Sequence, residues 1–152
     1  MRIAIADRLV VDASVLVELL GPGPFRDDVA PLFDPRRTTE YWIPDLCPVE
    51  VANALRKRLV HDAAYTVEDL YQSVARVFRL GPTIVPATGF VLEAIRHARE
   101  LSVYDAIYLV MAGSLGAPLC TLDRALASRS RRAGVVVLQP GTSAFRRWLA
   151  AP

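Results

Sequence analysis

Four acidic side chains with apolar surroundings lie far apart along the chain, and they are the groups best suited to chemistry. They are Asp12, Glu50, Asp105 and Asp123. Asp105 is the most isolated, because no other charged residue lies between Glu100 and Asp123. A buried carboxylate without a partner costs several kcal/mol or shifts its pKa until it is neutral. Each of these acids therefore needs a compensating group.

A divalent cation is the compensating group that these residue types favour. Four carboxylates that converge on one place repel one another, and they remain ionised together only beside a cation. Oxygen ligands without nearby histidine or cysteine favour Mg²⁺ or Mn²⁺ over Zn²⁺. Such an ion binds phosphate oxygens and activates water for attack on phosphorus. The acids thus indicate metal-assisted hydrolysis of a phosphate ester.

Helix capping is the alternative explanation for each acid. Asp105 completes a Ser102-x-x-Asp105 capping box, and Asp12 and Asp123 precede expected helices as possible N-caps. Glu50 would be favoured by the positive end of its helix dipole. Caps are usually exposed, whereas three of the four acids lie in strongly apolar sequence, and this favours the shared site.

Three polar residues lie close in sequence to the acids. Ser14 and Thr121 are expected to orient the carboxylates of Asp12 and Asp123 or a metal-bound water. Asn53 is one helical turn beyond Glu50 and points the same way. Ordinary capping or a solvated helix face is the alternative for all three. The two histidines, His61 and His97, lie in charged stretches and are expected at the surface.

Short apolar strands that alternate with helices must position these residues. The expected strands are 9–12, 41–43, 83–86, 118–123 and 135–139; the expected helices are 14–20, 48–61, 66–80, 88–101, 102–116 and 125–132, with a further short helix in 25–34 that Pro31 interrupts. This alternation predicts an α/β domain, with a mostly parallel sheet of about five strands and helices on both faces. Ligands bind beyond the carboxyl ends of such strands, where Asp12 and Asp123 are expected.

Length and composition fit one folded domain that spans residues 1–152. The chain is 53% hydrophobic and carries a net charge of +2. Lys57 is the only lysine among 18 basic residues, and arginine suits phosphate binding, although a GC-rich genome also explains it. Candidate phosphate contacts are Arg36-Arg37, Arg56-Lys57-Arg58, Arg129 with Arg131-Arg132, and Arg146-Arg147.

A cytoplasmic location is expected. Asp7 and Arg8 interrupt the opening MRIAIADR before a secretory signal develops, and Asp105 and Pro118 interrupt the apolar run at 101–120. Cys47 and Cys120 lack metal-type spacing; one disulfide is possible, but two buried thiols are expected.

At this point the motifs resemble a known family. VVDASVLVELL, PVEVANALRKR and LSVYDAIYLVMAGSLGAPLCTLDRALA carry Asp-x-Ser, Glu-x-x-Asn, Tyr-Asp-Ala-x-Tyr and Thr-x-Asp in order. Together they resemble the PIN-domain ribonucleases, most closely the VapC-type toxins of type II toxin–antitoxin pairs. The resemblance implies a PIN-like three-layer fold and an endoribonuclease that cleaves RNA with a metal-activated water.

The resemblance also implies the parts of the site and the partners. Asp12, Glu50, Asp105 and Asp123 would build the Mg²⁺ or Mn²⁺ site, Ser14 would support it, and Asn53 and Thr121 match frequent polar neighbours. The partners would be RNA, a cognate antitoxin and a second copy in a homodimer, with Leu16, Val17 and Leu20 as a possible dimer surface. Tyr104 and Tyr108 are candidates for stacking on a base, with core or dimer packing as the alternative.

Three departures from the family pattern are visible. MRIAIA and Asp7 precede the usual start, Pro31 breaks the second helix, and Cys47-Pro48 occupies a helix start that is often small and polar. None of them is expected to touch the four acids. The alternative functions are a housekeeping RNA-processing PIN nuclease and a non-catalytic interaction module. A phosphatase of the Asp-x-Asp type is weaker, because Ser14 stands where the second acid would be.

Overall fold

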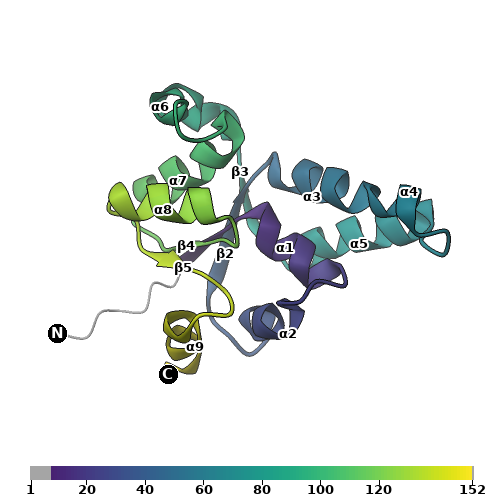
Figure 1. Cartoon of the computed structure of the whole chain (residues 1–152). Coiled ribbons are helices and arrows are strands. Elements are labelled where there is room, and N and C mark those ends of the chain that lie inside the picture. Colours follow the sequence, from purple (N-terminus) through teal and green to yellow (C-terminus); the bar gives the residue numbers. More distant parts are fainter. Residues whose placement is uncertain (1–7, 152) are drawn as a thin grey trace.

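One parallel sheet forms the centre of the computed structural model, which describes residues 8–151 (Figure 1). Its strands are β1 (Arg8–Val11), β2 (Glu40–Pro44), β3 (Thr83–Val85), β4 (Leu119–Cys120) and β5 (Val137–Leu138). They lie in the order β3-β2-β1-β4-β5, and every neighbouring pair is parallel. The predicted α/β class with five parallel strands and surrounding helices is confirmed. The MRIAIA extension lies outside the described residues.

Nine helices surround this sheet in the described part of the chain. They are α1 (Ala13–Leu20), α2 (Arg26–Val29), α3 (Cys47–Arg56), α4 (Arg58–His61), α5 (Val67–Arg79), α6 (Val91–Ala94), α7 (Val103–Leu115), α8 (Arg124–Arg132) and α9 (Ser143–Ala150). Short 3-10 turns span Ala30–Phe33, Ala87–Phe90 and Ile95–His97. In Figure 1, α3, α4 and α5 extend away from the sheet as one arm. None of the helices in residues 8–151 is long and apolar enough to cross a bilayer.

The segment around Asp105 is apolar because it forms α7, which runs through the core. Residues 106–112 of this helix are all buried, and α7 packs against β1, β2, α6 and α8. The Ser102 hydroxyl caps its first turn, and Gly116 ends it in the left-handed conformation at φ 59°. Glycine adopts this conformation without strain, so the helix ends as the sequence predicts.

The prediction of one continuous helix at 88–101 is wrong. The chain instead forms a 3-10 turn at Ala87–Phe90, α6 and another 3-10 turn. The Asp45 carboxylate accepts a 2.9 Å hydrogen bond from the backbone N–H of Ala87, so a distant acid fixes where this segment begins. Thr88 does not cap it.

Three smaller differences concern the ends of elements and one surface. The helix expected at 48–61 begins at Cys47 and is interrupted at Lys57. The ambiguous tail forms α9, which Thr142 caps. Leu16 and Leu20 are buried in the chain's own core and Val17 is partly buried against it, so the expectation that the three form a dimer surface is wrong for Leu16 and Leu20.

The order of the strands changes direction at β1. From β1 the chain moves to β2 on one side and later returns to β4 on the other, with Val11 paired to Cys120. The carboxyl ends of β1 and β4 therefore lie side by side at a topological switch point, where ligands bind in parallel sheets. Cys120 and Cys47 are both free and buried, as predicted.

Candidate active site

Asp12 lies at the carboxyl end of β1 and is the most buried of the four acids. Its Oδ2 accepts hydrogen bonds from Ser14 Oγ at 2.5 Å and from Thr121 Oγ1 at 2.8 Å. Its side chain makes no capping hydrogen bond to α1, so capping does not explain this acid. Burial raises the pKa of Asp12, while the two hydroxyls oppose that rise and the charge of Asp105 adds to it. The fold thus holds a costly carboxylate in a fixed orientation.

Hydroxyl groups connect this carboxylate to the segment that follows β4. Ser14 Oγ accepts the backbone N–H of Leu122 at 3.0 Å, and Thr121 Oγ1 accepts the N–H of Asp123 at 3.0 Å. The predicted role of Ser14 in orienting Asp12 is therefore present in the structure. Thr121 also orients Asp12, whereas the sequence paired it with Asp123.

Asp123 is exposed and caps α8. Its Oδ1 accepts the N–H of Leu126 at 2.7 Å, so the capping explanation holds for one of its oxygens. The position still lies beside Asp12, because Thr121 is hydrogen bonded to both residues.

Asp105 occupies the first turn of α7 and takes part in only half of a capping box. Ser102 Oγ accepts the N–H of Asp105 at 3.1 Å and donates to Asp105 Oδ2 at 2.6 Å. A complete box exists in α5, where the Asp69 carboxylate also accepts the N–H of Thr66. The carboxylate of Asp105 is not used to cap the backbone, which leaves it available for another role.

Glu50 projects from the first turns of α3 toward the same region. Burial, followed by the charges of Asp12 and Asp105, raises the pKa of Glu50 to about 7, against the effect of a hydrogen bond from Tyr108. That bond joins Tyr108 Oη to Glu50 Oε2 at 2.6 Å. Asp12, Glu50 and Asp105 therefore share one electrostatic environment in which full ionisation is unfavourable.

The four predicted acidic side chains do not converge on a single point. Within residues 8–151, no three acidic, histidine or cysteine side chains are grouped closely enough to hold a metal ion as they stand. Asn53 is exposed on α3 and forms no side-chain hydrogen bond to another described residue. His61 is exposed and His97 is half-buried. The arrangement places hard oxygen donors near the carboxyl ends of β1 and β4, and Asp12, Glu50 and Asp105 repel one another there.

Tyr108 is the part of the site that the sequence did not reveal. It is wholly buried, so stacking on a base is wrong for Tyr108, while Tyr104 is 63% exposed. The available signal was its place one turn beyond Asp105, on the same side of the helix. Cys47 packs beside its hydroxyl, and burial raises the pKa of this thiol to about 12. The departure at Cys47 therefore lies beside Tyr108, and in the described residues Cys47 makes no hydrogen bond to any of the four acids, as expected.

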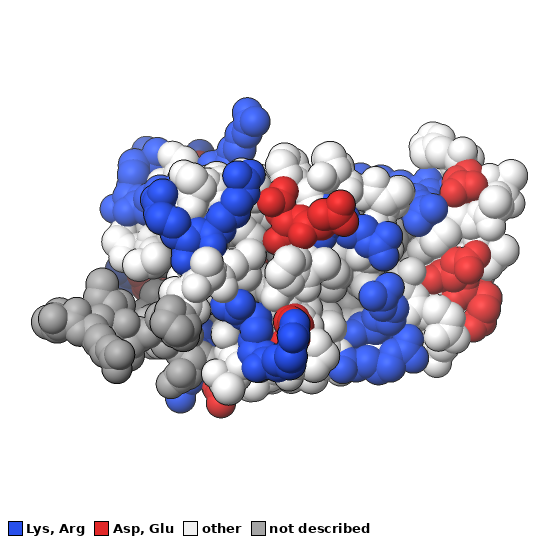
Figure 2. Space-filling view, turned by 90° about the horizontal axis from the view of Figure 1, so that it is seen from below, with Lys and Arg blue, Asp and Glu red and all other residues white. Residues whose placement is uncertain are grey.

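Most of the arginine clusters are engaged in contacts within the chain. Arg36 pairs with Asp34, Arg37 lies over Trp148, Arg58 pairs with Asp62, Arg129 and Arg132 pair with Glu100, and Arg146 pairs with Asp28. Arg56 and Lys57 are exposed and form no ion pair with described residues. On the face shown in Figure 2, basic side chains form separate groups with acidic groups between them. Phosphate contact by one of these clusters remains a prediction.

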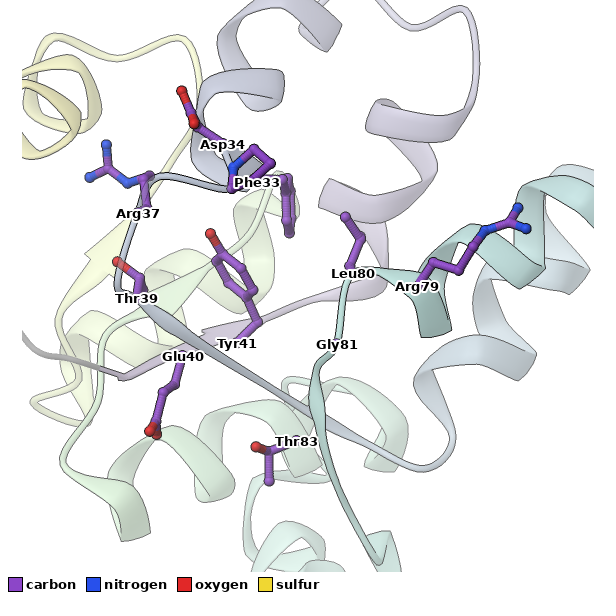
Figure 3. A pocket seen from close by; sticks show the side chains of 11 residues that line it. Phe33, Asp34, Arg37, Thr39, Glu40, Tyr41, Arg79, Leu80, Gly81 and Thr83 are labelled. Atoms are coloured by element: carbon purple, nitrogen blue, oxygen red, sulfur yellow. The ribbon is translucent and has the colours of Figure 1, made fainter.

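A pocket of about 430 Å³ lies at the amino ends of β2 and β3 (Figure 3). It is lined by the segments that lead into β2 and β3, including Thr39, Glu40 and Thr83. The rings of Phe33 and Tyr41 contact each other there, with centroids 5.0 Å apart. In a parallel sheet the amino ends of all strands lie on one side and the carboxyl ends on the other. This pocket is therefore separate from Asp12 and Asp123, which follow the carboxyl ends of β1 and β4.

Comparison with known proteins finds the same fold and related sequences. The PIN domain family model matches residues 9–131. Ribonuclease VapC3 of Pyrobaculum aerophilum is 31% identical over 128 residues, which cover 80% of this chain and 94% of that protein. The crystal structure of PAE2754 from Pyrobaculum aerophilum has a TM-score of 0.67 at 23% identity, covering 97% of this chain and 92% of that one. That of FitAcB from Neisseria gonorrhoeae has a TM-score of 0.55 at 18% identity, covering 85% and 95%.

Proposed function

The chain belongs to the PIN-domain family, and from this premise we propose that it is a divalent-metal-dependent endoribonuclease, the toxin of a toxin–antitoxin pair. The observation that carries the proposal is the anchored, desolvated carboxylate of Asp12 at the switch point. Burial raises the pKa of the neighbouring Glu50, and the charges of Asp12 and Asp105 add to that rise. A protein gains nothing in stability from such repulsion. The relationship to a ribonuclease supports RNA as the substrate.

The donor set fits Mg²⁺ or Mn²⁺. Asp12, Glu50, Asp105 and Asp123 would hold the ion, because all four present carboxylate oxygens, the ligands that these ions prefer. When bound, the ion supplies an acidified water and positive charge beside the scissile phosphate. A cation would also relieve the repulsion that raises the pKa of Glu50.

The chain's own residues would orient groups and move protons. Ser14 and Thr121 hold Oδ2 of Asp12, so this carboxylate cannot rotate freely. Glu50 would serve either as a further ligand of the ion or as the group that positions the attacking water and accepts its proton. By family analogy the products are a 5′-phosphate and a 3′-hydroxyl, and the 2′-hydroxyl is not the nucleophile.

Removal of the Asp12 charge tests the proposal. Asp12→Asn keeps the size of the side chain and an oxygen that accepts from Ser14 and Thr121. We expect the variant to stay folded and to lose at least about a hundredfold in RNA cleavage, as is typical when a metal ligand or its support is removed. Cleavage of a mixed RNA substrate in Mg²⁺ and in Mn²⁺, with and without EDTA, measures this. Wild-type cleavage by Asp12→Asn, or undiminished cleavage in EDTA, contradicts the site.

A cognate antitoxin and a homodimer complete the proposal. The antitoxin is proposed from the relationship to a VapC ribonuclease. For the homodimer, α5 offers Val67, Tyr71 and Phe78, which are each more than half exposed and share one face of the helix. This face replaces the expected surface at Leu16 and Leu20.

A further inference from the structure

Tyr108 makes a buried polar contact that the proposed chemistry does not by itself require. The residue lies in the middle of α7 and is completely buried, yet its hydroxyl donates to Glu50 Oε2 on α3 at 2.6 Å. The two residues are 58 positions apart in the sequence. A buried tyrosine hydroxyl needs a partner, but a backbone carbonyl would satisfy it, as Leu32 O does for Tyr41. That the Tyr108 hydroxyl instead donates to the Glu50 carboxylate therefore indicates a role in the site.

Glu50 depends on this one contact for its orientation. Within residues 8–151, Tyr108 is the only group that hydrogen bonds to the Glu50 carboxylate, whereas Asp12 is held by two hydroxyls and Asp105 by Ser102. A glutamate side chain has three rotatable bonds and turns freely unless something fixes its end. Tyr108 thus does for Glu50 what Ser14 and Thr121 do for Asp12.

The position of Tyr108 also couples two acids of the site. Asp105 and Tyr108 are three residues apart on α7, so one rigid helix carries the first acid and the group that holds the second. Both lie in the helix that packs against β1 and β2. A fixed α7 therefore sets the position of the Glu50 carboxylate relative to Asp105.

We propose that Tyr108 is a positioning residue, whose hydroxyl fixes the orientation of the Glu50 carboxylate relative to Asp105 and thereby supports binding of the divalent ion. This inference rests on the proposed metal-dependent nuclease activity. Tyr108 does not contact the ion or the RNA in this role, because it is wholly enclosed in the core.

Tyr108→Phe is the direct test, because it removes the hydroxyl and keeps the ring. Tyr41→Phe is the matched control, since the Tyr41 hydroxyl also donates within the chain but lies at the opposite edge of the sheet. Mn²⁺ affinity of the full chain is measured by calorimetry, and RNA cleavage is separated into kcat and KM. For Tyr108→Phe we expect about tenfold or greater loss in Mn²⁺ affinity, a lower kcat and an unchanged KM for RNA. Tyr41→Phe is expected to match the wild type in all three.

Other outcomes separate this inference from the proposed function. A wild-type chain that neither binds Mn²⁺ nor cleaves RNA refutes the proposed function. If the wild type does both and Tyr108→Phe equals it, the positioning role is overturned. In a Glu50→Gln background, Tyr108→Phe is expected to add no further loss of Mn²⁺ affinity; an equal additional loss means that Tyr108 acts through the core and not through Glu50.

A structural measurement tests the contact without any activity. In a crystal structure of metal-free Tyr108→Phe, we expect the Glu50 carboxylate to leave its place; an unchanged position overturns the inference. If Tyr108→Phe does not fold, the Tyr108 hydroxyl proton is observed by NMR in the wild type and in Glu50→Ala. Its chemical shift is expected to move upfield in Glu50→Ala, because the hydrogen bond to the carboxylate is lost, and an unchanged chemical shift overturns the inference.

Discussion

Individual carboxylates in this chain are stabilised by neighbouring hydroxyls and destabilised by one another. The Asp12 carboxylate is desolvated and receives two hydroxyls, and Glu50 receives one while facing two like charges. In the absence of a cation, the protonated form of Glu50 is favoured, because it avoids a buried charge beside two like charges. This makes the stability of the metal-free protein depend on pH in a specific direction.

The folded chain keeps the Glu50 proton up to about pH 7, while the unfolded chain loses it near pH 4.5. Between these values the folded state binds more protons, so stability falls as pH rises and stays at the lower level above pH 7. We expect the metal-free protein to be less stable at pH 8 than at pH 5, on the order of 1 kcal/mol after screening at this half-buried group. Thermal melting in EDTA measures the difference, and Glu50→Gln should flatten it. An equally steep pH dependence in Glu50→Gln assigns the effect to other groups.

The helices show how the same local motif serves two purposes. Thr66 and Asp69 form a complete capping box at α5, far from the acids. Ser102 and Asp105 have the same spacing, but Ser102 receives the backbone N–H while the Asp105 carboxylate leaves the N-cap N–H unbound. The same spacing therefore gives a structural acid at Asp69 and a candidate functional acid at Asp105.

Matched alanine substitutions test this separation. Asp69→Ala loses the carboxylate side of a complete box, so we expect a small loss of stability, seen as a lower denaturant midpoint, and unchanged RNA cleavage. Asp105→Ala retains the Ser102 cap, because that cap uses the backbone N–H, and it removes a charge that repels Asp12 and Glu50. Its stability is expected to be nearly unchanged while RNA cleavage is lost. Denaturant unfolding and a cleavage assay on both variants decide, and a reversed pattern would refute the assignment of Asp105.

Local signals predicted the elements, and long-range contacts explain most of what they missed. β1, α5, α7 and α8 follow apolar runs and caps that are visible in the sequence. The predicted helix 88–101 is wrong, and the start of the segment that replaces it is set by Asp45, distant in sequence, which accepts the N–H of Ala87. For the site, Ser14 and Asp12 are sequence neighbours and were linked correctly. The Tyr108–Glu50 contact joins two helices across the fold, and neither residue's local sequence reveals it.

At the scale of the whole molecule, the exposed face of α5 is suited to a second copy of the chain. Val67, Tyr71 and Phe78 form an apolar stripe with exposed fractions of 71%, 65% and 54%. Glu68 and Asp69 lie near its start, and basic residues lie near its end. Two such helices paired antiparallel across a two-fold axis would place the acidic end of each beside the basic end of the other.

Tyr71→Asp tests this arrangement by placing a charge in the centre of the stripe. Aromatic residues at the centre of an interface commonly carry about 2 kcal/mol, so we expect self-association about 30-fold weaker than in the wild type. Leu92→Asp is the control, because Leu92 is 83% exposed on α6, away from the stripe. Sedimentation over a concentration series measures both. A Tyr71→Asp chain that associates as strongly as the wild type, or a wild type that stays monomeric, excludes the α5 interface.

The neighbouring positions of β1 and β4 have a consequence for the cell that makes this protein. Asp12 is synthesised early, but its partner Thr121 follows 109 positions later. While the chain grows on the ribosome, the first strand has no neighbour on that side and its carboxylate has no threonine to hold it. Under the proposed function, a partly synthesised chain therefore lacks the complete acidic site, and the ribosome that makes it works beside an inactive polypeptide until β4 and Thr121 have been added.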